Sequence, residues 1–223
     1  MDISPDQVKH ALLSLIAFII SVSVHEFGHA WMATRLGDDL PRTQGRLTLS
    51  PMSHIDPIGT ILLPLISALV PASIPMLAWG KPVQTNPAAY TRRISQRMGH
   101  LLVAVTGPLM NLVLALVASV LFVVLAKAGV MSVALGVALI NYLVMLNIML
   151  MFFNLLPVPP LDGGAVLAGV LPERFQFIAQ FLQRYGMIVF FILLMSGALG
   201  IVMRPAGAVG HAWGAFLMRF VPA

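Results

Sequence analysis

The sequence predicts an all-α polytopic membrane protein, on the evidence of its composition and of its long apolar runs. Of its 223 residues, 59% are hydrophobic and only 9% are charged, whereas about 25% are charged in an average soluble domain. So few charges cannot cover a soluble protein of this length with polar surface. Several runs also reach the roughly 18 apolar residues that a membrane-spanning helix needs, the clearest being Leu101–Leu125, Val133–Leu156 and Met187–Met203. We therefore expect about 4–6 transmembrane helices.

The first predicted helix runs from about Gln7 to Leu36 and ends at Gly37, a residue typical of helix C-termini. Its apolar run begins at Ala11 and continues to Met32. That length exceeds the hydrophobic region of a cleaved signal peptide, so we expect this helix to stay in the protein.

A short membrane-associated β-hairpin or a re-entrant segment is expected after the first helix. Residues 45–51 alternate in the manner of a strand and end on Pro51, which predicts a short edge strand. Residues 58–77 are apolar but contain Pro64, Pro71 and Pro75. These prolines favour a hairpin that enters the membrane and returns, and the alternative is a kinked ordinary span.

Positive charges predict which side of the membrane the loops occupy. Lysine and arginine are enriched in cytoplasmic loops, and both loops that flank residues 58–77 are basic. Both can be cytoplasmic only if residues 58–77 do not cross completely. We expect this arrangement in a prokaryotic plasma membrane, since no organelle transit segment is evident. The basic residues are Arg35, Arg42 and Arg46, then Lys81, Arg92, Arg93 and Arg97.

The rest of the chain predicts three long apolar helices, centred near residues 113, 145 and 195, with a break at Pro157, Pro159 and Pro160. The tail from Ala206 predicts an interfacial helix or a short final span. Residues 1–223 form one predicted domain, with a core over about 10–170 and C-terminal helices over about 174–223. Four glycines inside or beside the apolar helices indicate close helix contacts: Gly107, Gly129, Gly136 and Gly197.

Two classes of site are excluded by composition. The chain has no cysteine, so it has neither disulfides nor cysteine-based zinc sites. Its formal net charge is +5, but in so apolar a chain the clustered basic residues set membrane orientation, and we expect no nucleic-acid partner.

The residues His25-Glu26-Phe27-Gly28-His29 fit the pattern H-E-x-x-H. On a helix, positions i and i+4 lie on one face, so two imidazole nitrogens can converge on one metal ion. Glu26 lies beside them, where it can accept a proton from a water whose pKa zinc lowers from 15.7 to about 7. Ionisable groups are costly inside an apolar helix, by roughly 2.5–3.5 kcal/mol for a central charge, so a function is the natural interpretation.

A catalytic zinc usually has three protein ligands, so one more is expected. Asp162 stands out because it directly follows the proline break after a predicted membrane helix. It also precedes Gly163 and Gly164, which allow close backbone approach. The alternative for Asp162 is a helix cap or a turn residue. The eight acidic residues are Asp2, Asp6, Glu26, Asp38, Asp39, Asp56, Asp162 and Glu173.

Taken together, four motifs resemble the site-2 protease family of intramembrane zinc metalloproteases, in its compact subgroup without PDZ or regulatory nucleotide-binding domains. The resemblance covers roughly residues 10–200. It implies one zinc ion per chain, with His25, His29 and Asp162 as ligands and Glu26 as general acid/base. The motifs are H-E-F-G-H at 25–29, G-R-L-T-L-S-P with H-I-D-P-I-G at 45–59, G-P-L-M-N at 107–111 and N-L-L-P-V-P-P-L-D-G at 154–163.

Three further polar residues are candidates for substrate or oxyanion binding. The family resemblance implies that Asn111 and Asn154 hold or polarise substrate, since an amide can donate to an oxyanion. The alternative for both is hydrogen bonding between helices. His54 is a candidate for orienting a ligand or stabilising the oxyanion, or else it caps the turn that leads to Asp56.

The predicted function is hydrolysis of peptide bonds in or near transmembrane segments of membrane proteins, as in regulated intramembrane proteolysis. The active site is expected toward the cytoplasmic side of the membrane. Partners would be transmembrane substrates and the lipid bilayer, with a homo-oligomer left open. An extended substrate could pair with the predicted strand Arg46–Ser50. The alternatives are a metal or proton transporter and a non-catalytic scaffold that binds membrane segments.

Overall fold

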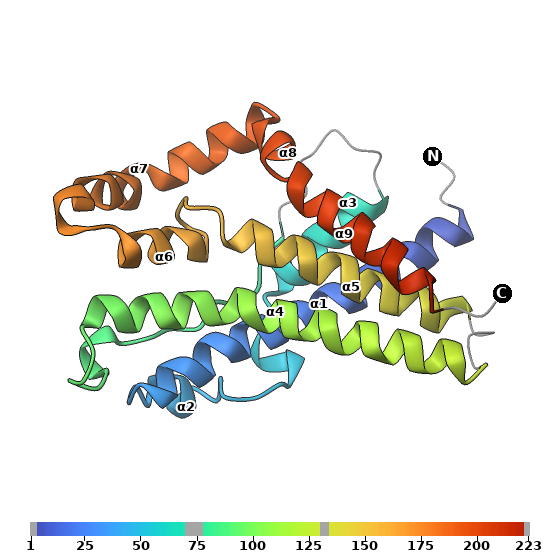
Figure 1. The fold of residues 1–223 in the computed structure, drawn as a ribbon, viewed down its shortest axis with the longest axis horizontal. Helices are drawn as coiled ribbons and strands as arrows, with labels where there is room; N and C mark the ends of the chain where they lie inside the picture. Colours follow the sequence, from blue (N-terminus) through green and yellow to red (C-terminus); the bar gives the residue numbers. More distant parts are fainter. Residues whose placement is uncertain (1–3, 70–77, 130–133, 221–223) are drawn as a thin grey trace.

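A computed structural model describes residues 4–69, 78–129 and 134–220, and this part of the chain is built from helices (Figure 1). The α-helices are α1 (Pro5–Arg35), α2 (Leu40–Thr43), α3 (Leu63–Leu69), α4 (Gln96–Lys127), α5 (Ala134–Asn154), α6 (Asp162–Val170), α7 (Gln176–Met195), α8 (Ala198–Val202) and α9 (Arg204–Met218). Short turns of other helix types are η1 (Pro51–Ser53), η2 (Pro57–Leu62), η3 (Pro87–Ala89) and η4 (Glu173–Phe175).

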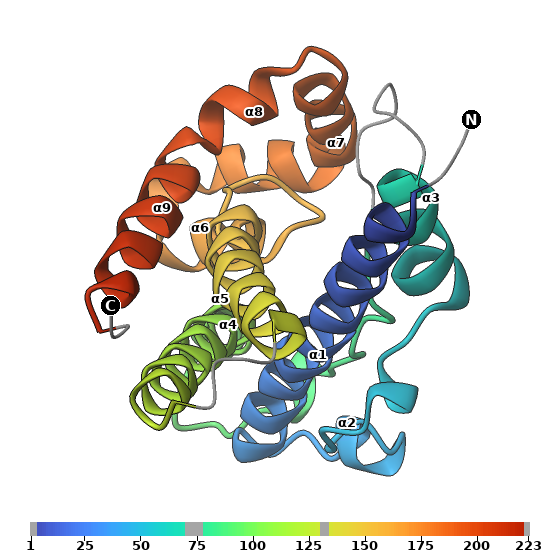
Figure 2. The same ribbon diagram turned by 90° about the vertical axis from the view of Figure 1, so that its right-hand side faces the viewer.

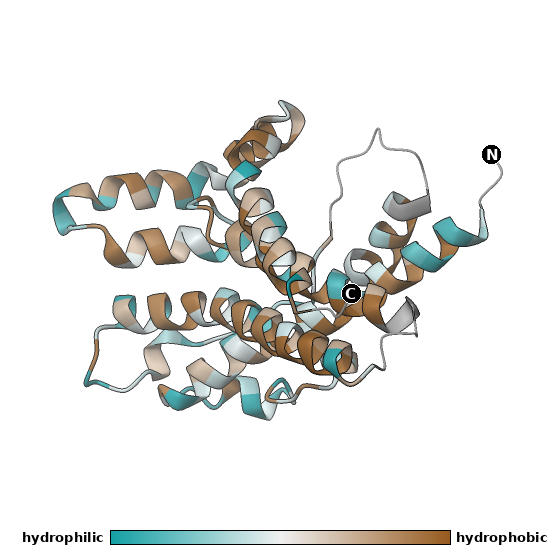
Figure 3. Cartoon of the chain, turned by 45° about the vertical axis from the view of Figure 1, so that its right-hand side comes forward, coloured by the Kyte–Doolittle hydropathy of each residue, from teal (hydrophilic) through white to brown (hydrophobic). Residues whose placement is uncertain are grey.

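Four helices in the described residues are long and apolar enough to cross a membrane: Pro5–Arg35, Gln96–Lys127, Val137–Asn154 and Glu173–Met195. Hydrophobic residues run along the length of these helices, and polar residues gather toward their ends (Figure 3). A membrane helix needs this pattern, because its side chains meet lipid instead of water. The predicted class of all-α polytopic membrane protein is confirmed.

The helices α1, α4 and α5 pack against one another and form the centre of the protein, with α6 against α4 and α9 against α5 (Figure 2). Small, branched and aromatic side chains fill the space between α4, α5 and α9, including Ala115, Ile148 and Phe122. Such packing is how helices associate in lipid, where burial of apolar surface between helices contributes little.

Both ends of α1 carry local stop signals. Ser4 Oγ accepts from the Gln7 N–H at 3.2 Å while the Ser4 N–H donates to Gln7 Oε1 at 2.9 Å, a reciprocal pair that satisfies the first backbone groups of the helix. At the other end Gly37 adopts a φ of 102°, which only glycine reaches without strain. The predicted helix over about 7–36 is confirmed.

The predicted edge strand at Arg46–Ser50 is wrong, because the described residues contain no strand and this segment is irregular. Its backbone groups find local partners instead of a neighbouring strand. The Arg46 N–H donates to the Pro41 carbonyl at 2.8 Å, and the Thr48 carbonyl accepts from His54 Nε2 at 2.8 Å. The β-hairpin and the strand pairing with substrate at these residues therefore have no basis in the structure.

Residues near the two ends of the apolar segment that follows, 58–77, are hydrogen-bonded to each other. The Trp79 N–H donates to the Gly59 carbonyl at 3.1 Å, and Thr60 Oγ1 donates to the Trp79 carbonyl at 2.7 Å. Between these points α3 packs beside α1 (Figure 2), while residues 70–77 of the predicted re-entrant segment lie outside the described part.

The two basic loops meet at one end of the helix bundle. The Thr91 N–H donates to the Leu36 carbonyl at 2.6 Å, and the Asn86 N–H donates to Asp38 Oδ2 at 2.6 Å. Because these bonds join the loop after α1 to the loop before α4, the positive charges of both loops gather at the same end, as the sequence predicts.

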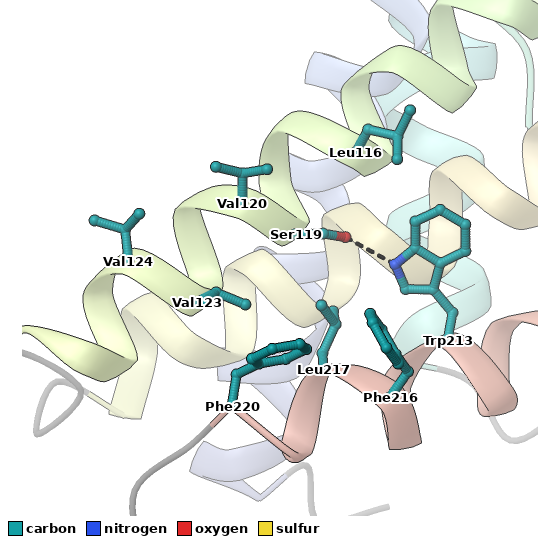
Figure 4. A pocket seen from close by; sticks show the side chains of 9 residues that line it. All are labelled: Leu116, Ser119, Val120, Val123, Val124, Trp213, Phe216, Leu217 and Phe220. Atoms are coloured by element: carbon teal, nitrogen blue, oxygen red, sulfur yellow. Dashed lines mark hydrogen bonds between the residues drawn. The ribbon is translucent and has the colours of Figure 1, made fainter.

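The last apolar run, Met187–Met203, is not one helix. It breaks at Ser196 and Gly197, where Gly197 has a φ of 73°. The chain then folds back as α9, which has 15 residues. Trp213 of α9 donates its indole N–H to Ser119 Oγ of α4 at 2.9 Å, beside an apolar cavity of about 470 Å³ between the two helices (Figure 4).

Candidate metal centre and catalytic residues

Two histidines from α1 and one aspartate from α6 converge in the middle of the helix bundle. His25 Nε2 and His29 Nε2 lie 3.0 Å apart. Asp162 Oδ2 lies 3.1 Å from His25 Nε2, and Asp162 Oδ1 lies 3.4 Å from His29 Nε2. The ligand atoms of all three residues are within 4.8 Å of one another. The structure thus brings together the three residues that the sequence predicts as ligands.

Asp162 reaches the histidines because the chain turns sharply after α5 and starts α6 at this residue. Gly163 and Gly164 make the turn possible. A Cβ on Gly163 would lie 2.2 Å from the Leu156 carbonyl oxygen, and one on Gly164 would lie 2.7 Å from the Pro159 ring. Any side chain at these positions would collide with this turn and displace the start of α6, and Asp162 with it.

The other ring nitrogen of each histidine faces an oxygen of α4. His29 Nδ1 lies 2.8 Å from the Val103 carbonyl oxygen, and His25 Nδ1 lies 2.7 Å from Asn111 Oδ1. A carbonyl oxygen can only accept, so each Nδ1 carries the hydrogen. In a neutral imidazole the Nε2 atom then has a lone pair, which is the form that binds a metal ion.

The centre is therefore rich in lone pairs and poor in hydrogens. Two Nε2 lone pairs face each other, and the buried Asp162 Oδ2 has no hydrogen-bond donor among the described residues. A cation would satisfy all of these atoms at once. Two imidazoles and one carboxylate suit zinc, whose bonds to nitrogen measure about 2.0–2.1 Å, so nitrogens this close can both reach one ion. The residues fit a zinc ion.

Glu26 is buried next to this centre, and a loop holds its side chain. The Val83 N–H donates to Glu26 Oε2 at 2.9 Å. The loop itself is fixed by the Lys81 N–H, which donates to the His54 carbonyl at 2.9 Å, and by Arg46, which donates to the Pro82 carbonyl at 2.8 Å. The segment before α4 therefore sets the direction of the Glu26 carboxylate.

Gly107 of α4 makes room for the histidine pair. A Cβ at this position would lie 2.4 Å from His29 Nε2 and 2.8 Å from the Cε1 atom of His25. The predicted close contact at Gly107 is confirmed, and the neighbour is the candidate metal centre. By contrast, Gly129 and Gly197 have φ values of 70° and 73° and open space around them, so they end helices. The surroundings of Gly136 lie outside what the structure describes.

The three candidates for substrate or oxyanion binding, Asn111, Asn154 and His54, differ in burial and in hydrogen-bond partners. Asn111 is fully buried, and its amide contacts His25 and two neighbouring helices. Asn154 is half-buried at the end of α5, with Nδ2 donating to the Leu150 carbonyl at 3.0 Å. His54 is fully buried and its Nε2–H donates to Thr48, while burial lowers its pKa, so its ring is neutral.

One residue that contacts Asn111 directly is not predicted as a site residue from the sequence. Asn147 of α5 is fully buried and accepts from Asn111 Nδ2 at 2.7 Å. Its signal in the sequence is a lone amide inside the apolar run Val133–Leu156, a position where asparagine normally bonds to another helix.

The fold and the site define a class: a polytopic helical membrane protein with a candidate metal-binding triad between its helices and an adjacent glutamate. The chain belongs to peptidase family M50, the site-2 proteases, whose family model matches residues 13–197. The family resemblance seen in the four motifs is confirmed, and the chain is a metallopeptidase of this family.

Similar proteins come from bacteria and archaea. The chain is 34% identical to "Putative zinc metalloprotease YwhC" of Bacillus subtilis, over 86% of this chain and 84% of that protein. It is 33% identical to "Putative zinc metalloprotease Rip2" of Mycolicibacterium smegmatis, over 84% of this chain and 68% of that protein. "Zinc metalloprotease MJ0392" of Methanocaldococcus jannaschii is 22% identical, over 89% of this chain and 46% of that protein. No solved structure matches the chain.

Proposed function

We propose that this protein is an intramembrane zinc endopeptidase that hydrolyses peptide bonds in or beside the transmembrane segments of other membrane proteins. The observation that carries the proposal is the buried group of two Nε2 lone pairs and an Asp162 oxygen without a donor, next to Glu26 and between apolar helices. Membership of peptidase family M50 and the zinc metalloprotease names of the relatives support the metal and the reaction class.

In this proposal His25, His29 and Asp162 hold the zinc ion. When bound, zinc supplies a Lewis acid for the scissile carbonyl and acidifies the attacking water. Glu26 accepts the proton of that water through the carboxylate oxygen that Val83 does not occupy, and then delivers the proton to the leaving amine. The Val83 N–H keeps the carboxylate from turning away.

Asn154 is the amide that we propose for the substrate. Only one of its two amide hydrogens is needed for the Leu150 carbonyl, so the other can donate to the oxyanion. Asn111 is less suited to this role, because its Nδ2 already donates to Asn147 and to the Ser21 carbonyl. The neutral His54 ring has one N–H, which the Thr48 carbonyl engages, so a role as an oxyanion donor, which stays a prediction, would require this bond to be exchanged.

We propose that the end of the bundle with the basic loops faces the cytoplasm, in accordance with the positive-inside rule. The hydrogen bonds that join Gly59 and Thr60 to Trp79 support a re-entrant segment between them, because a complete crossing would separate these residues by the width of the membrane. The bacterial and archaeal relatives support a prokaryotic plasma membrane.

The transporter alternative is less favoured by the geometry. A transport pathway needs groups spread along its length, whereas the metal-binding residues here converge on one point. The scaffold alternative gives no function to Glu26 or to the ligand atoms of His25, His29 and Asp162. It remains an outcome of the experiment below.

The proposal predicts that Glu26→Gln binds zinc like the wild type but loses cleavage. Glutamine keeps the shape of the side chain and cannot take a proton, so the loss should reach about 10²–10⁴-fold in kcat, the usual contribution of a general acid/base. Zinc content and the cleavage of a panel of single-pass model substrates would be measured on the purified proteins in detergent.

Glu173→Gln is the matched control, because Glu173 is exposed in the loop before α7. It should cleave like the wild type. Cleavage by Glu26→Gln at the wild-type rate would remove Glu26 from the mechanism. Bound zinc without cleavage of any substrate by the wild type would favour the scaffold.

A further inference from the structure

Three fully buried polar side chains connect the centres of α1, α4 and α5 behind His25. Asn147 Nδ2 lies 2.7 Å from Ser21 Oγ and 2.8 Å from the Leu143 carbonyl oxygen. Asn111 Nδ2 lies 2.7 Å from Asn147 Oδ1 and 3.3 Å from the Ser21 carbonyl oxygen. Asn111 Oδ1 completes the series at His25 Nδ1. Ser21, Asn111 and Asn147 each have 0% exposure, so this hydrogen-bonded network is closed to solvent up to the imidazole of His25.

The direction of every hydrogen bond in this network is fixed by backbone carbonyls, which can only accept. Ser21 Oγ donates its hydrogen to the Ala17 carbonyl at 2.7 Å, so toward Asn147 it can only accept. Asn147 must therefore turn its NH₂ toward Ser21 and toward the Leu143 carbonyl. Its oxygen then faces Asn111.

The same argument continues one step nearer the metal centre. Asn111 faces the Asn147 oxygen and the Ser21 carbonyl on one side, two acceptors that require its NH₂ group there. Its oxygen is left for His25. A reversed Asn111 amide would set oxygen against oxygen at Asn147 and would present hydrogens to His25 Nδ1, which would move the imidazole hydrogen to Nε2 and block that ligand atom.

We infer that Asn147 and Ser21 are positioning residues, which hold the Asn111 amide with its oxygen toward His25 and so keep His25 in the tautomer that offers Nε2 to zinc. His29 needs no such network, because its Nδ1 bonds directly to the Val103 carbonyl. This inference rests on the proposed function and adds to it two residues, Ser21 of α1 and Asn147 of α5, that fix the orientation of one ligand through Asn111.

The test compares zinc affinity in three variants, measured by competition with a chelating dye on the full-length protein in detergent. Asn147→Leu has a side chain of similar size without polar atoms, and it frees Asn111 to turn over. Its zinc affinity should fall by about 10–100-fold, the usual effect of losing an outer-shell partner. Ser119→Ala is the matched control, because it also removes a hydrogen bond between helices, the partly buried one to Trp213, and should keep the wild-type affinity.

The decisive variant is the double change Asn111→Asp with Asn147→Leu. A carboxylate offers an acceptor to His25 Nδ1 whichever way it is turned, so it no longer needs Asn147 to orient it. Most of the lost zinc affinity should return. A merely structural role of Asn147 would not be rescued in this way.

Two results would overturn the inference: wild-type zinc affinity in Asn147→Leu, or a double variant that stays as weak as Asn147→Leu. Neither result touches the proposed function, which is judged by whether the wild type binds one zinc ion and whether cleavage depends on Glu26.

Discussion

Asp162→Asn is expected to lose zinc and, with it, all detectable cleavage. The two carboxylate oxygens lie 3.1 Å and 3.4 Å from the two Nε2 atoms, so the substitution removes the only negative charge from the ligand group and adds NH₂ hydrogens to a site built of lone pairs. Zinc affinity should fall by more than the factor of about 10–100 that is usual when a residue behind a ligand is changed. Metal content after dialysis and cleavage of a model substrate are the measurements.

Asp39→Asn provides the control, because it makes the same chemical change at an exposed residue outside the site. It should keep one zinc ion per chain and normal cleavage. If Asp162→Asn retained zinc through purification and dialysis, a different third ligand would have to be sought, and Asp162 would become a turn residue at the start of α6.

The convergence of the three candidate zinc ligands could be predicted because their geometry is local or is marked by the chain itself. His25 and His29 are one helical turn apart, so their convergence follows from the helix alone. Asp162 is far away in sequence, but the prolines before it and the glycines after it mark a sharp turn, and the structure shows why both glycines are needed.

The strand at Arg46–Ser50 shows where a local pattern fails. Alternation of polar and apolar residues indicates a strand only if another strand is present to pair with it. Here Pro41 and His54 take the backbone groups that a partner strand would need. The pattern contains no information about those competing partners.

Asn147 shows a different limit. An asparagine in an apolar helix indicates a bond to another helix, but the partner depends on how α5 is rotated against α1 and α4. Once the partners Ser21 and Asn111 are known, backbone carbonyls fix the direction of each bond, and the role follows. The residue type could be noticed from the sequence, whereas its connection to His25 could not.

Gly107→Ala is expected to lose zinc almost as completely as Asp162→Asn, although it adds only one methyl group. The new carbon would lie 2.4 Å from His29 Nε2 and 2.5 Å from His29 Cε1, much closer than such atoms approach. If the imidazoles move away, the ligand atoms leave the site. If α4 moves away instead, Val103 and Asn111 move with it and the Nδ1 bonds lengthen. Either movement should weaken zinc binding by at least about 100-fold, the upper end for outer-shell changes.

Gly207→Ala separates this effect from the general cost of changing a helical glycine. Gly207 lies within α9 with nothing near its would-be Cβ, so alanine there should leave zinc binding unchanged. Zinc affinity would be compared by chelator competition, with size-exclusion chromatography to show that both variants remain folded. A folded Gly107→Ala variant with wild-type zinc affinity would mean that α4 does not pack against the histidine pair as closely as described, and the positioning of His25 through Asn111 would then need to be reconsidered as well.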